Sequence, residues 1–122
     1  MTDGIDEPAI DAGHLDEATD GDVALQREVL ELFAKRAERL EIALGTATER
    51  GARRVAAHEL RGASLAIGAR QVATAAQKLE EACLAGSDPT TTAMFVEALL
   101  DASRTARAEA VRMIAARQGE AT

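Results

Sequence analysis

The feature that most restricts the fold is the absence of helix-breaking residues over most of the chain. Proline occurs only as Pro8 and Pro89, and no residue between them breaks a helix outright. No segment alternates with the period of two that is expected of a strand. Apolar residues instead recur at steps of three and four, as on the buried face of a helix. The clearest series is Val29, Leu32, Phe33, Ala37, Leu40 and Leu44.

Composition favours the same conclusion, an all-α chain. Hydrophobic residues make up 47% of the 122 residues, yet Phe33 and Phe95 are the only aromatic ones. The apolar share is carried by Ala, Leu, Val and Ile. Ala and Leu are strong helix formers, and small Ala side chains let helices approach closely. A chain of this length is expected to form one domain.

Glycines and capping residues divide the chain into helices. Asp22 can cap a helix after the break at 20–22, Gly68 and Gly86 can each end one, and Pro89 suits a first turn. The predicted helices span 9–18, 23–48, 52–67, 69–85 and 89–116, with 1–8 as a flexible tail and 9–118 as the domain. Four long helices with short connections predict an up-down-up-down four-helix bundle with a short extra N-terminal helix.

Charge and cysteine content exclude several functions. The chain has 21 acidic and 14 basic residues and a formal net charge of -7, which argues against binding nucleic acid or anionic membranes. No apolar stretch has the length of a membrane span, and the acidic N-terminus is not a signal peptide. We therefore expect a cytoplasmic protein. Cys83 is the only cysteine and His14 and His58 the only histidines, so neither a disulfide nor a metal site is expected.

The segment 57–69 carries the residues with chemical potential. On a helix it divides into two faces, because residues three and four apart are neighbours. The face expected to pack into the bundle consists of Leu60, Ala63 and Ile67. The face expected to point outwards consists of His58, Arg61, Gly62 and Leu65.

Three residues of the outward face suit phosphoryl chemistry. A neutral imidazole such as that of His58 is a competent nucleophile toward an activated phosphoryl group. The forked donors of Arg61 match phosphate oxygens. Gly62 costs about 1 kcal/mol relative to Ala inside a helix. It either permits close helix packing or clears space beside His58 for a partner.

The same segment resembles a known signature. The pattern His58-x-Leu60-Arg61-Gly62-Ala63-Ser64-x-x-Ile67-Gly68-Ala69 is similar to that of bacterial histidine-phosphotransfer (HPt) domains, which usually read His-x-Leu-Lys-Gly-small-small. The resemblance continues through Val72 and Leu79-Glu80-Glu81 and, more loosely, over about residues 9–117. It implies that His58 is phosphorylated, that Arg61 replaces the usual lysine at the phosphoryl group, and that Gly62 leaves room for a receiver domain. Ser64 and Glu80 fall where such domains often place polar residues near the imidazole.

The resemblance implies a phosphoryl carrier and not an enzyme. The sequence contains no glycine-rich phosphate loop, so it is not expected to bind ATP. The phosphoryl group would come from a receiver domain of a response regulator or hybrid histidine kinase, or from a kinase, and pass to another receiver domain. No cofactor is expected, since any Mg²⁺ would be held by the partner. We expect a monomer whose docking surface includes Leu65 and the first helix near Leu15.

Two other interpretations stay open. The stretch His58-Glu59-Leu60-Arg61 also resembles the start of the phosphoacceptor box of dimeric sensor kinases, although Gly62-Ala63 follows here in place of Thr-Pro. That interpretation predicts an obligate dimer. A helical adaptor without chemistry is the other, and it predicts that His58→Gln changes only surface behaviour. The fold does not distinguish these functions, because all of them use a helical bundle.

Overall fold

Five helices account for nearly all of the structure, a computed structural model that describes residues 7–120 and the side chains of residues 7–118. The helices are α2 (Ala12–Ala18), α3 (Val23–Thr46), α4 (Arg50–Ile67), α5 (Arg70–Ala85) and α6 (Pro89–Glu120). The predicted all-α class is confirmed over this range. Residues 1–6 of the predicted tail lie outside the described residues.

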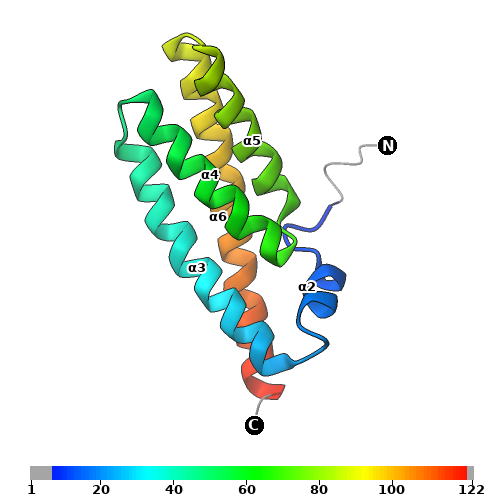
Figure 1. Ribbon diagram of the computed structural model, residues 1–122. Helices are drawn as coiled ribbons and strands as arrows, with labels where there is room; N and C mark the ends of the chain where they lie inside the picture. The colour runs from blue at the N-terminus through cyan, green and yellow to red at the C-terminus, as the bar shows by residue number, and fades with distance from the viewer. Residues whose placement is uncertain (1–6, 121–122) are drawn as a thin grey trace.

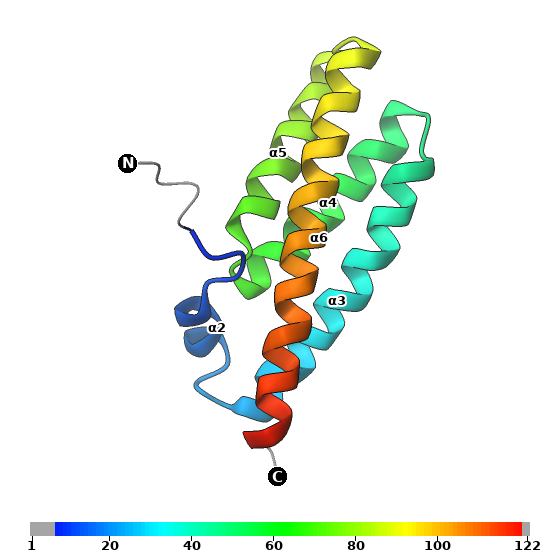
Figure 2. The ribbon, with the colours of Figure 1, turned by 180° about the vertical axis from the view of Figure 1, so that it is seen from behind.

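The four long helices form the predicted antiparallel bundle. Each packs against two neighbours, in the order α3, α4, α5, α6 and back to α3 (Figures 1 and 2). The short helix α2 packs against α4 near the α4–α5 turn. Its attachment includes a hydrogen bond in which the Asp11 backbone N–H donates to the Gly68 carbonyl, 3.0 Å away. The extra N-terminal helix therefore covers one end of the bundle.

The core is built from leucine and alanine in layers between the helices. Leu30, Leu40, Leu44, Leu60, Leu79 and Leu99 are fully buried, and Ala37, Ala57, Ala76, Ala106 and Ala110 fill the spaces between them. The predicted apolar series on α3 needs one correction, because Leu32 is 55% exposed. The buried stripe of α3 centres on Leu30, Phe33 and Ala37, which places Leu32 at its edge.

The two glycines that were predicted to end helices do so. Gly68 and Gly86 follow α4 and α5 with φ values of 77° and 71°, a conformation that glycine adopts without steric cost. Gly68 has a second constraint, since a Cβ there would lie 3.0 Å from the Cβ of His14. Glycine thus lets α2 approach the end of α4.

Other helix ends differ from the prediction by a few residues. The first helix begins at Ala12 and not at residue 9, because the Asp11 carboxylate caps it by accepting a hydrogen bond from the His14 backbone N–H. The helix α4 begins at Arg50, two residues early, and α6 continues to Glu120. Such shifts arise where capping and packing decide the boundary rather than helix propensity.

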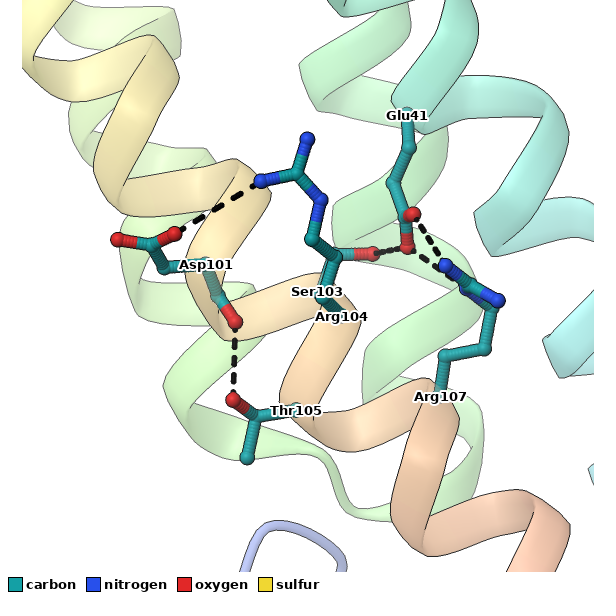
Figure 3. A network of polar contacts seen from close by, with 6 residues as sticks. All are labelled: Glu41, Asp101, Ser103, Arg104, Thr105 and Arg107. Carbon is teal, nitrogen blue, oxygen red and sulfur yellow. Dashed lines mark hydrogen bonds and ion pairs between the residues drawn. The ribbon is translucent and has the colours of Figure 1, made fainter.

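A buried polar cluster joins α3 to α6. The Glu41 side chain is 7% exposed and accepts three hydrogen bonds, one from the Ser103 hydroxyl at 2.8 Å and two from the Arg107 guanidinium at 2.9 and 3.1 Å (Figure 3). The two parallel bonds from arginine have the fork geometry that suits a carboxylate. This cluster fixes the register of the two helices.

Candidate functional site

His58 lies midway along α4 with an imidazole held at one nitrogen and open at the other. Its side chain is 70% exposed, and Nδ1 lies 3.0 Å from Oε2 of Glu80 on α5. A carboxylate can only accept hydrogen bonds, so this contact favours the tautomer with the proton on Nδ1. The lone pair then remains on Nε2. The arrangement presents a nucleophilic nitrogen from a fixed ring.

Glu80 is the residue that organises the site. Its side chain is 14% exposed, and its two oxygens face different partners on α4. While Oε2 meets His58, Oε1 lies 3.8 Å from Nη1 of Arg61. That distance is too long for a hydrogen bond, and Oε1 is buried without any hydrogen-bond partner. Arg61 is therefore held near the imidazole by charge alone and can turn toward another anion.

Gly62 faces open space. A Cβ at this position would meet nothing within 4 Å, so the absent side chain does not serve close packing between helices. The close-packing interpretation of Gly62 is therefore wrong, and the clearance of the surface beside His58 stays a prediction. Leu65, one turn further along α4, is about half exposed as predicted.

Two of the predicted site residues are placed elsewhere, and those predictions are wrong. Ser64 is fully buried, and its hydroxyl donates to the Leu60 carbonyl at 2.7 Å, so it does not lie beside the imidazole. Leu15 is fully buried as well and cannot contribute to a docking surface. For Ser64 a signal existed, since its spacing from Leu60 and Ile67 puts it on the buried face of α4.

A shallow apolar groove lies beside the site, between α3 and α4. It encloses about 100 Å³ and is lined by Val29, Leu32, Phe33, Arg36, Ala63, Ala66 and Ile67. The helical spacing of Val29 and Leu32 does not show where α3 and α4 leave a gap between them, so the sequence alone does not predict this groove. Leu32, one of its lining residues, is 55% exposed.

The remaining candidate groups are the possible metal ligands and Cys83. No group of three or more potential metal ligands occurs among the described residues. Burial raises the pKa of the Cys83 thiol, against the lowering effect of nearby arginines, so Cys83 is a poor nucleophile. Within residues 7–120 no helix is long and apolar enough to cross a membrane.

Comparison with known proteins identifies a matching family. The model of a family described as Hpt domain matches residues 24–109, a range that includes His58, Arg61, Gly62 and Glu80 and most of the four-helix bundle. No curated protein matches, and neither does any solved structure.

Proposed function

Because the chain belongs to the Hpt domain family, whose members transfer phosphoryl groups through histidine in two-component signalling, we propose that it relays a phosphoryl group between receiver domains on His58. The observation that carries this proposal is the contact of His58 Nδ1 with the Glu80 carboxylate on an imidazole that is otherwise exposed. A histidine with only a surface role needs no buried carboxylate to orient it. In a nucleophile such a carboxylate has a use, because it holds the proton on Nδ1 and so leaves the lone pair on the exposed Nε2.

The proposed step is a displacement at phosphorus. The Nε2 lone pair of His58 attacks the phosphorus of a phosphoaspartate on the partner. A P–N bond forms as the acyl P–O bond breaks, and the aspartate leaves as a carboxylate. Nδ1 keeps its proton, and the Glu80 carboxylate balances the positive charge that develops on the ring. In the reverse direction an aspartate carboxylate attacks phosphorus, and the imidazole leaves in its neutral form.

Arg61 and Gly62 serve the transferred group and the partner. The Arg61 guanidinium lacks a hydrogen bond to Glu80 Oε1, which lies 3.8 Å away, so it can turn to the phosphoryl oxygens without losing one. Gly62 leaves the surface one turn beyond His58 without a side chain. A receiver domain can therefore bring its phosphoaspartate close to the imidazole, together with any Mg²⁺ that the receiver holds.

We further propose that the chain acts as a monomeric carrier in the cytoplasm rather than as a kinase-type dimer. The four long helices of one chain close a core around Leu30, Leu60 and Leu99. A dimerisation domain instead needs a second chain to complete its bundle. The monomer leaves His58 free for a transient partner, as a relay requires.

A phosphotransfer assay tests the proposal. Receiver domains labelled at the phosphoaspartate are mixed with the wild-type chain and with His58→Gln. We expect label on the wild type alone, stable in alkali and lost in acid, as for phosphohistidine. Label on the variant would place the acceptor elsewhere. Absence of label on the wild type with every receiver tested would favour the adaptor interpretation.

The oligomeric state distinguishes the proposed monomeric carrier from a kinase-type dimerisation domain. Sedimentation of the wild-type chain at increasing concentration is expected to give the mass of one chain of 12.8 kDa. A stable dimer in which His58 is labelled by a kinase but by no receiver domain would favour the sensor-kinase interpretation.

A further inference from the structure

The N-terminal half of α4 carries cations that the proposed step does not use. Arg50 and Arg54 precede His58 at intervals of four residues, and Arg61 follows it at an interval of three. At about 100° per residue, these four residues lie within an arc of about 80° on the helix surface. Arg50, Arg54 and Arg61 thus form a cationic row along the face that presents His58.

The row lies on the side of α4 that faces α5. Arg61 approaches Glu80 of α5, and a Cβ on Gly86, at the end of α5, would lie 3.9 Å from Nη1 of Arg50. Burial raises the pKa of Cys83, one turn after Glu80 on α5, and the charges of Arg53, Arg50 and Arg54 oppose this rise. On the other side of His58 the surface carries Gly62 and the exposed Val55. The imidazole therefore stands between a cationic flank and an apolar one.

Arg50 and Arg54 have no role in stability that the structure reveals. Neither guanidinium forms an ion pair with any carboxylate among the described residues, although the chain has 21 acidic residues. Arg50 is the first residue of α4, and the N-cap residue Glu49 makes no side-chain capping bond. Cations at the N-terminal end of a helix lie near the positive pole of the helix dipole, and this repulsion is unfavourable for helix stability.

We propose that Arg50 and Arg54, together with Arg61, receive an acidic face of the receiver domain and steer it onto His58. This inference rests on the proposed phosphotransfer function. A row of exposed cations on a chain of net charge -7 attracts an acidic surface locally, while the remainder of the chain repels it. The partner is thereby oriented as well as attracted.

The dimensions of a transient complex agree with this assignment. At about 1.5 Å per residue, Arg54 lies about 6 Å and Arg50 about 12 Å from His58 along the helix axis. A contact patch of about 600 Å² per partner, a size found in transient complexes, has a radius of about 14 Å. A receiver centred on His58 therefore covers both arginines.

The test compares two double variants of the full chain that lose the same charge. Arg50→Gln with Arg54→Gln removes the row, and Arg27→Gln with Lys35→Gln removes two cations from α3, which lies diagonally across the bundle from α5. Transfer from a labelled receiver domain is measured at about 25 and about 300 mM NaCl. At low salt we expect the first variant to raise KM about tenfold with kcat unchanged, and this difference to shrink at high salt as screening sets in. The α3 variant is expected to stay within about twofold of the wild type.

Other outcomes would contradict either the inference about Arg50 and Arg54 or the proposed function itself. Equal KM values for the wild type and the Arg50/Arg54 variant at low salt would overturn the inference alone. Equal losses in both double variants would also overturn it, since net charge would then be the cause. A lower melting temperature of the Arg50/Arg54 variant would mean that the row supports the fold. Failure of every receiver to label the wild type would overturn the proposed function and the inference with it.

Discussion

Two glutamates of this bundle, Glu41 and Glu80, each face an arginine on a neighbouring helix. They differ in how completely their carboxylate oxygens are hydrogen-bonded. Glu41 of α3 has both oxygens hydrogen-bonded to α6, through Arg107 and Ser103. Glu80 of α5 has one oxygen on His58 and the other buried without a hydrogen bond, 3.8 Å from Arg61. A polar network with every partner in place rigidifies an interface. The incomplete network at Glu80 leaves a guanidinium that can form a new pair, as the proposed transfer requires.

The two clusters also differ in their expected roles, stability for the Glu41 cluster and function for the Glu80 cluster. The groups around Glu41 are satisfied and lie away from the outward face of α4. The site around His58 instead includes a buried oxygen without a hydrogen bond and a glycine inside a helix, and both are unfavourable for stability. Features of this kind are expected at functional sites. Substitutions in the two clusters should show whether the Glu41 cluster serves stability and the Glu80 cluster serves phosphotransfer.

The largest effect on stability is expected at Glu41. Glu41→Ala removes the acceptor of three hydrogen bonds and leaves the fully buried Ser103 hydroxyl without its partner. We expect the free energy of unfolding to fall by about 3 kcal/mol, the lower end for a broken buried pair, because Arg107 can still reach water. Urea unfolding measures this as a lower midpoint at unchanged slope. A loss below about 1 kcal/mol would contradict the stabilising role of the cluster.

Glu80→Ala is expected to affect transfer more than stability. A hydrogen bond to a charged group contributes about 1.5 kcal/mol or more, so its loss from His58 should slow phosphotransfer about tenfold. Stability should change little, because the substitution also removes the unpaired Oε1. Nitrogen NMR of the imidazole provides an independent measurement, since the variant should lose the preference for a proton on Nδ1. An unchanged tautomer would show that Glu80 does not position the ring.

Much of this organisation was predictable from the sequence. The bundle follows from apolar spacing, and the ends of α4 and α5 follow from Gly68 and Gly86, because both signals are local. The outward placement of His58 and Gly62 follows from the same helical spacing. Glu80 was expected near the imidazole only through the family resemblance, since no local pattern relates a residue of α5 to one of α4.

The features that were not predicted depend on contacts between distant segments. Leu15 is buried because α2 packs across the end of the bundle, and this packing rules out the docking role that was predicted for it. The pairing of Glu41 with Arg107 joins residues 66 positions apart. The groove beside Leu32 likewise exists only where α3 meets α4. Tertiary packing decides all three.

Replacement of arginine by lysine should lower the free energy of unfolding by about 1 kcal/mol in the Glu41 cluster and leave it unchanged in the Glu80 cluster. Arg107 binds Glu41 through two parallel hydrogen bonds, a geometry that lysine cannot reproduce, so Arg107→Lys should lower stability by about 1 kcal/mol. Arg61 makes no such pair, and Arg61→Lys should leave stability unchanged and support transfer. Chemical denaturation of both variants checks the difference. Equal losses would mean that Arg61 is as firmly held as Arg107.

The smallest expected effect has the opposite sign and lies at Gly62. Gly62→Ala should stabilise the chain by about 0.5–1 kcal/mol, because alanine is the better helix former and its Cβ meets nothing within 4 Å. Transfer from a receiver domain should nevertheless become slower, since the added methyl group occupies the surface on which the partner approaches His58. Gly45→Ala in α3 is the matched control, as its Cβ also meets nothing within 4 Å. It should stabilise without slowing transfer. If Gly62→Ala stabilised the fold and transferred at the wild-type rate, the glycine would not be kept for access, and the contrast between the two clusters would rest on Glu80 and Arg61 alone.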